Sequence, residues 1–171
     1  MKSTALNSSE YNSYYEHYIS VVGDIDLMTS LKEGLTFLTE FISNIPDNKL
    51  SYVYAKDKWS IAEILMHLVD SERVFQHRAL RFARNDKTPV PGFDQDFYVP
   101  SSRANFRNKE SILNEFAVVR QSTIALFDSF NDEELTRSGI ASDSNMSVRA
   151  LGFVICGHLK HHANIIQNKY L

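Results

Sequence analysis

Apolar residues recur at steps of three and four along much of the chain, which is the period of an α-helix that buries one face. Residues 26–45 keep this spacing from Leu27 to Ile45, after which Pro46 interrupts it. This stretch predicts a long amphipathic helix. The tyrosine-rich residues 11–22 before it predict a short N-terminal helix that packs against the others.

A second long helix has a clear start signal. Ser60 is followed three residues later by Glu63, the spacing of a capping box in which each side chain bonds a free backbone N–H at the helix end. The helical pattern then continues until the polar pair Asn85-Asp86 ends it. The sequence therefore predicts a helix over residues 60–84.

No helical or strand period can be read between residues 87 and 108, which contain Pro89, Pro91, Gly92 and Pro100. We interpret this segment as one long ordered loop. Loops of this length are uncommon in compact domains and often form lids or binding loops. The segment is therefore a candidate cover for a site.

Two further helices complete the pattern. Residues 109–130 carry an apolar stripe, residues 132–136 form a short helical turn, and residues 138–147 read as a polar loop that leads to a last helix. Four long helices, with no segment that has the period of a strand, predict an all-α four-helix bundle. No break in composition divides residues 1–171, so we expect a single domain.

Composition and charge narrow the classes of function. The chain has 43% hydrophobic and 23% charged residues and a formal net charge of -3, which fits a globular domain and offers no basic field for a nucleic acid. We find no signal sequence and no run of about 18 apolar residues that could span a membrane. The lone Cys156 fits a reducing compartment, so we expect a cytoplasmic protein with an inert, buried thiol.

The strongest chemical signal is a group of histidines on the last helix. Side chains three or four positions apart share one side of a helix, so His158 could bind an ion together with either His161 or His162. His158 and His162 continue the apolar stripe of this helix, whereas His161 falls on the side of Gly157 and Asn164. We therefore choose His158 and His162, with the contribution of His161 left open.

A third ligand is expected from another helix, because catalytic zinc-type sites use three protein ligands and leave one position open. His67, in the middle of the second helix, is the best candidate. Glu63 lies one turn before it, and Asp70 and Ser71 lie one turn after it, so each could orient its ring. A histidine pair at helical spacing is also a common accident, and a buried histidine can be an ordinary core residue.

Several segments, in order along the chain, resemble the DinB-like family. They are residues 58–73, 78–84 and 91–96, followed by Gly157-His158 and His161-His162. The resemblance covers nearly the whole chain. It implies a bundle with up-down-down-up connectivity, often dimeric, that holds a divalent ion through three histidines. Carried over residue by residue, these are His67, His158 and His162.

The resemblance leaves the reaction open, because the family includes thiol-dependent S-transferases, a thiol-dependent isomerase and proteins described as metal-dependent hydrolases. We expect a metal-dependent enzyme that acts on a small molecule through a metal-bound thiol or water, with Asp70 or Glu63 as candidate acid–base residues. Zinc is our first choice for the ion and nickel our second, with a low-molecular-weight thiol as a candidate cosubstrate. The family also implies a homodimer.

The alternative is a non-enzymatic, stress-associated domain in which the ion only ties two helices together. Such a structural site would be closed by a fourth protein ligand, for instance His161 or Asp70.

In an enzyme, Arg149, Arg81 or Arg84 could bind a substrate carboxylate, although surface ion pairs explain these arginines equally well.

Overall fold

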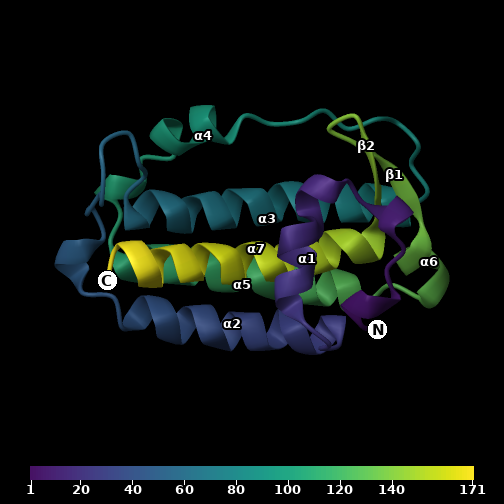
Figure 1. Ribbon diagram of the computed structural model, residues 1–171, viewed down its shortest axis with the longest axis horizontal. Helices are drawn as coiled ribbons and strands as arrows, with labels where there is room; N and C mark the ends of the chain where they lie inside the picture. The colour runs from purple at the N-terminus through teal and green to yellow at the C-terminus, as the bar shows by residue number, and fades with distance from the viewer.

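Four long helices make up most of the molecule in the computed structural model, which describes residues 1–171 (Figure 1). They are α2 (Leu27–Ser43), α3 (Ile61–Ala83), α5 (Lys109–Asp128) and α7 (Val148–Lys169). Each begins at a polar residue whose side chain accepts a backbone N–H of the first turn. The predicted all-α four-helix bundle is confirmed. None of the helices is long and apolar enough to cross a lipid bilayer.

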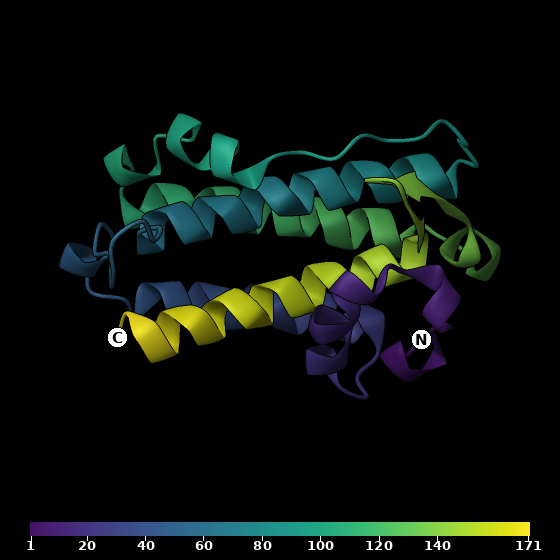
Figure 2. The ribbon, with the colours of Figure 1, turned by 45° about the horizontal axis from the view of Figure 1, so that its top comes forward.

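The bundle has up-down-down-up connectivity, as predicted. Helices α2 and α7 run in one direction and α3 and α5 in the other (Figure 1 and Figure 2). Helix α3 packs against α5 and α7, as does α2, so α2 and α3 lie on a diagonal although they are consecutive long helices. A short turn joins antiparallel neighbours, whereas the parallel neighbours α3 and α5 need a crossover connection. The chain therefore returns along the bundle between them.

This connection, residues 84–108, is not the unbroken loop expected from its prolines. It contains α4 (Gln95–Ser101) and the 3-10 helix η5 (Ala104–Phe106). Asp94 starts α4 by accepting hydrogen bonds from two backbone N–H groups of the first turn. Pro100, which argued against a helix, lies in the last turn of α4.

A short β-hairpin stands where a polar loop was expected before the last helix. Strand β1 (Ser138–Ala141) pairs antiparallel with β2 (Ser144–Ser147). The turn between them consists of Ser142 and Asp143, both with positive φ, as a type I′ hairpin turn requires. The expectation that no strand forms is therefore wrong for these residues, because strands this short and polar show no period in sequence.

Contacts on two sides hold the hairpin. A Cβ at Gly139 would lie 2.3 Å from the ring of Phe82, so glycine is needed for β1 to pack on α3. On the other side, the N–H of Val90 donates to the carbonyl of Ile140 (2.9 Å), and the N–H of Ser142 donates to the carbonyl of Val90 (3.0 Å). These bonds tie the long connection to the hairpin.

The remaining elements are short. They are η1 (Ser3–Ala5), η2 (Ser8–Glu10), η3 (Ser13–Tyr15), α1 (Glu16–Val22), η4 (Asp47–Lys49) and α6 (Asp132–Thr136). Helix α1 crosses α7 (Figure 1 and Figure 2). At the crossing, a Cβ at Gly157 would lie 1.8 Å from the carbonyl oxygen of Tyr18, so only glycine permits this close approach.

The buried core divides into two apolar clusters with a polar layer between them. One cluster contains the buried apolar side chains of α3 up to Val69, and the other contains those from Phe75 onward. Between these levels lie the buried polar side chains of Ser71, Glu72, Arg120, Thr123 and His158. Buried polar groups are stable only when they are paired, so this layer is where a functional site is expected.

Candidate metal centre

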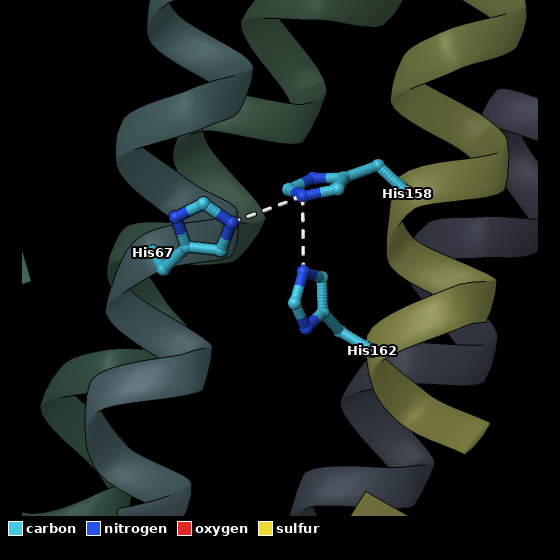
Figure 3. A group of neighbouring side chains, drawn as sticks. All are labelled: His67, His158 and His162. Carbon is cyan, nitrogen blue, oxygen red and sulfur yellow. Dashed lines mark hydrogen bonds between the residues drawn. The ribbon is translucent and has the colours of Figure 1, made fainter. Parts of the chain in front are cut away.

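Three histidine side chains meet inside the bundle, between α3 and α7 (Figure 3). His67 comes from α3, and His158 and His162 come from consecutive turns of α7. Nε2 of His158 lies 3.0 Å from Nε2 of His67 and 3.1 Å from Nε2 of His162. Ring nitrogens of all three lie within 4.8 Å of one another. The structure thus brings together the three histidines selected from the sequence.

The start of α3 sets the position of His67. The predicted capping box forms, with the N–H of Glu63 donating to Ser60 Oγ (3.2 Å) and the N–H of Ser60 donating to Glu63 Oε2 (2.7 Å). Trp59, just before the cap, packs its ring 4.9 Å from that of His67, measured between centroids. The helix start and an aromatic contact therefore hold this ring in place.

Aromatic rings also surround His158. The ring of Tyr18 meets it edge to face at 5.2 Å, and that of Phe75 does so at 6.1 Å. As a result, His158 is 6% exposed and His67 is 4% exposed, while His162 is partly exposed. The cluster is largely shielded from bulk water.

Burial keeps the three imidazoles neutral. It lowers the pKa of His67 to about 4. Burial, with smaller effects of His67 and His161, lowers the pKa of His162 to about 3. Burial and the neighbouring histidines also hold the pKa of His158 well below its usual range. At neutral pH each ring therefore has a nitrogen lone pair, which is the form that metal ions bind.

The facing ring nitrogens of the cluster cannot all be satisfied by hydrogen bonds among the three rings, whereas a bound cation would satisfy them. A neutral imidazole has one N–H and one lone pair. Nε2 of His158 faces two other ring nitrogens, and its single N–H or lone pair can satisfy only one of them. A divalent ion between the rings would accept all three lone pairs.

A hydrogen bond outside the cluster orients His67. Ser71 Oγ lies 3.3 Å from Nδ1 of His67. With Nδ1–H donating to Ser71, the lone pair of Nε2 points toward the other two histidines, which is how an outer partner selects a ligating tautomer. In contrast, Nδ1 of His162 is buried without a partner.

His161 is not one of the converging histidines. Its ring packs edge to face against the rings of His17 (5.5 Å) and Tyr18 (5.2 Å). The ring nitrogens that approach one another belong to His67, His158 and His162. The structure therefore places His161 beside the cluster, on the side covered by α1.

Neither predicted acid–base residue bonds to a histidine of the cluster. The carboxylate of Glu63 accepts hydrogen bonds from the N–H of Ser60 and from Nδ2 of Asn105 (3.1 Å). Asp70 lies 3.8 Å from Arg73, and burial raises the pKa of its carboxyl group. A catalytic role for either residue stays a prediction without a supporting contact.

Four other candidate residues have structural explanations. The arginines considered for substrate binding are all paired with acids. The pairs are Arg149–Glu10 (2.7 Å), Arg81–Asp86 (2.7 Å) and Arg84–Glu134 (3.2 Å). Cys156 is buried, and burial raises the pKa of its thiol, which fits an inert residue.

Two cavities reach the histidine cluster. The larger, of about 540 Å³, is lined by His67 and His158. Residues 92–95 of the long connection form part of its wall, which fits the expected covering role. The smaller, of about 380 Å³, is lined by His162 and Trp59. Small molecules therefore have access to the cluster by two routes.

Arg78 is a residue of the larger cavity that the sequence reasoning missed. Its side chain is 1% exposed and lines the cavity together with His67 and His158. Arg78 follows His67 by 11 positions, which is about three helical turns, so the two side chains share one face of α3. That spacing was the available signal.

Comparisons with known proteins place this histidine-bearing bundle in a family. The up-down-down-up fold and the three converging histidines define a class of helical bundles with a histidine cluster in the core. The model of the DinB superfamily matches residues 31–166, and the chain belongs to this superfamily. The "Putative metal-dependent hydrolase OB0413" of Oceanobacillus iheyensis is 25% identical over 142 residues, which cover 80% of this chain and 81% of that protein.

Two solved structures share the fold. YfiT from Bacillus subtilis, described as a probable metal-dependent hydrolase with an unusual four-helix bundle topology, has a TM-score of 0.72 at 15% identity, covering 95% of this chain and 89% of YfiT. The mycothiol-dependent maleylpyruvate isomerase has a TM-score of 0.69 at 9% identity, covering 84% of this chain and 61% of the isomerase. At these identities the likeness shows the fold alone.

The neutral histidines predict that acid destabilises the metal-free fold. An unfolded chain protonates its histidines near pH 6.5, whereas folded His67 does so only near pH 4. Below pH 6.5 the unfolded state therefore binds more protons. The free energy of unfolding should fall between about pH 6.5 and about pH 4, by up to roughly 1.4 kcal/mol per pH unit for each buried histidine. Denaturant titrations across this range measure the slope.

The variant His162→Gln is the matched control for this pH dependence. It removes one of the three suppressed titrations, so its free energy of unfolding should depend less steeply on pH than that of the wild type. Ring signals followed by NMR should not titrate above about pH 5 for the three cluster histidines. Titration of all three near the unfolded value would contradict the neutral cluster.

Proposed function

We propose that this protein is a metal-dependent enzyme that acts on a small molecule. The observation that carries the proposal is the convergence of three neutral imidazoles at the wall of a cavity. His67, His158 and His162 would hold the ion. A divalent ion held there would lower the pKa of a water or thiol bound to it and so would supply a nucleophile near neutral pH. Membership of the DinB superfamily and the name of the O. iheyensis relative support this proposal.

The number of converging side chains favours an enzyme over a purely structural metal site. Structural zinc sites are closed by four protein ligands, whereas catalytic sites use three and keep one position open. Both candidates for a fourth ligand have other contacts. The ring of His161 packs against His17, and Asp70 pairs with Arg73.

The two cavities favour a reaction between two molecules. One molecule could occupy the cavity beside His67 and His158, and the second could approach from the cavity beside His162. Transfer of a low-molecular-weight thiol to an electrophile brings two molecules together at one site, and a mycothiol-dependent isomerase shares the fold. Hydrolysis, the activity named for the O. iheyensis relative, needs only one substrate and water. We therefore put S-transfer first and hydrolysis second.

Residues of η3, α1 and α3 would bind and shield the substrate. The rings of Tyr15, Tyr18 and Phe75 line the larger cavity. The hydroxyl of Tyr18 is protonated at neutral pH, as a phenol ordinarily is, and burial raises its pKa further, so it can donate a hydrogen bond to a substrate oxygen. Apolar walls with a few polar groups are typical of small-molecule sites.

The identity of the ion and the state of assembly are further parts of this proposal. Imidazole nitrogens suit both zinc and nickel, and we put zinc first. The homodimer implied by the family stays a prediction, which light scattering after size-exclusion chromatography would test.

Elemental analysis of tag-free protein tests the proposed function. We expect about one divalent ion per chain, as three-histidine catalytic sites bind. A screen of thiols with electrophilic substrates should then reveal turnover that chelation abolishes and zinc restores. Protein that neither carries an ion nor binds added zinc would overturn the proposal, and thiol-independent turnover of an ester or amide would put hydrolysis first.

A further inference from the structure

Arg78 is a buried positive charge without an acidic partner. Its side chain is 1% exposed, and none of the ion pairs in the molecule includes it. Its two hydrogen bonds both come from Nη2 and go to uncharged oxygens, the carbonyl of Pro91 (3.1 Å) and the hydroxyl of Ser142 (3.0 Å). Its Nε is buried with no partner at all. A buried charge without a counter-charge is costly, so this arginine needs an explanation beyond packing.

Arg120 shows how the same bundle neutralises a buried arginine. Its side chain is also 1% exposed, but it donates from Nε and Nη2 to the two carboxylate oxygens of Glu72 at 2.7 and 2.8 Å. The interior of this fold can therefore supply an acid where an arginine is only structural. At Arg78 it supplies none.

The position of Arg78 points to a ligand as the missing partner. Its side chain lines the cavity of about 540 Å³, which is also lined by His67 and His158. Asp94 is the one acid in the wall of this cavity, and its carboxylate accepts backbone N–H groups at the start of α4. Arg78 also acts on Tyr15. Burial raises the pKa of the Tyr15 hydroxyl, and the nearby charge of Arg78 partly offsets this rise. The cationic group thus stands at the wall of the space that a substrate would enter.

We propose that Arg78 binds the carboxylate of a small organic acid and so makes carboxylate-bearing molecules the substrate class of this site. The inference rests on the proposed function, because it treats this cavity as the substrate cavity beside the histidines. A carboxylate supplies the missing negative charge through charge-assisted hydrogen bonds. One guanidinium matches one negative charge, and Asp94 in the same wall disfavours a doubly charged phosphate. The aromatic rings of the wall suit an apolar or aromatic body for the acid.

Calorimetric titration with benzoate and with its uncharged isostere benzamide tests this proposal. The wild-type protein should prefer benzoate by about tenfold or more, since a hydrogen bond to a charged group is at stake. Arg78→Met should lose this preference. Arg84→Met is the control, because Arg84 caps the C-terminal end of the same helix but pairs with Glu134, and it should keep the preference.

Two further variants separate this inference from a structural role and from the metal proposal. Arg78→Gln keeps a donor for Pro91 without the charge, so it should fold and still lose the preference for benzoate. His162→Ala should keep the preference even without an ion, so a failure of the metal proposal leaves this result intact. Absence of benzoate binding to the wild type, a preference retained in Arg78→Gln, or a preference that disappears with His162 would each overturn the assignment.

Discussion

Replacing His158 by alanine is expected to abolish stoichiometric metal binding. Its Nε2 is the nitrogen that approaches both other histidines, so its loss removes the centre of the cluster. His67→Ala and His162→Ala should have the same effect, because each leaves only two imidazoles. Loss of an outer-shell partner costs roughly 10- to 100-fold in metal affinity, and loss of a ligand should cost more. Elemental analysis after dialysis against a weak chelator, with zinc affinity from competition titrations, measures the effect.

The matched control is His161→Ala. His161 lies on the same helix turn as His162 and is partly buried, but its ring packs on His17 and Tyr18 outside the cluster. This variant should retain the metal content of the wild type. If His161→Ala removes the ion while His162→Ala leaves it bound, then His161 and not His162 points toward the cluster in solution, and the proposed ligand set is wrong.

Much of this site could be predicted because two of its three histidines are local neighbours on one helix. The spacing of His158 and His162 and the apolar stripe of their helix fix which side they face, whatever the fold. The capping box at Ser60 likewise depends only on two residues three positions apart, Ser60 and Glu63. The meeting of His67 with the other two depends on α3 lying beside α7, which no local pattern contains. The position of His67 in the middle of its helix makes it the best candidate, and the family resemblance supports that choice.

The hairpin and the cavity could not be predicted in the same way. Strands β1 and β2 are stabilised by contacts with Phe82 and Val90, which are distant in sequence, so their own residues carry no strand pattern. Arg78 shares a helix face with His67, and this could have been read from the spacing. The absence of an acidic partner for Arg78 could not be read from the sequence, because such a partner can come from any part of the chain. Glu72, for example, pairs with Arg120 from 48 positions away.

The ion pair of Glu72 and Arg120 joins α3 to α5 within the polar layer of the core. The two side chains are 3% and 1% exposed. Nη1 of Arg120 also donates to the carbonyl of Leu31 (3.3 Å), which links α2 to the same group. Burial lowers the pKa of Arg120, but the charge and hydrogen bonds of Glu72 outweigh this and raise it. The pair and His158 line one narrow internal gap, so the pair supports the helices that carry the histidines.

Replacing Glu72 by glutamine is expected to lower the free energy of unfolding by about 3–5 kcal/mol, because it leaves the charge of Arg120 buried without a counter-charge. Urea denaturation followed by circular dichroism measures the change. The double variant Glu72→Leu/Arg120→Met should be more stable than either single variant, since it leaves no buried charge. Both results would assign the loss to an unpaired charge and not to a missing contact.

An exposed ion pair between the same two helices provides the control. Arg73 of α3 donates to Glu115 of α5 at 2.6 Å, but its side chain is 47% exposed. Arg73→Met should therefore change the free energy of unfolding by less than about 1 kcal/mol. Both pairs join the same two helices, but Arg73 and Glu115 are more exposed, and Glu115 keeps Arg107 as a partner after Arg73 is replaced. Equal effects of Glu72→Gln and Arg73→Met would mean that water reaches Arg120, and the polar layer would then be too wet to keep the neighbouring imidazoles neutral.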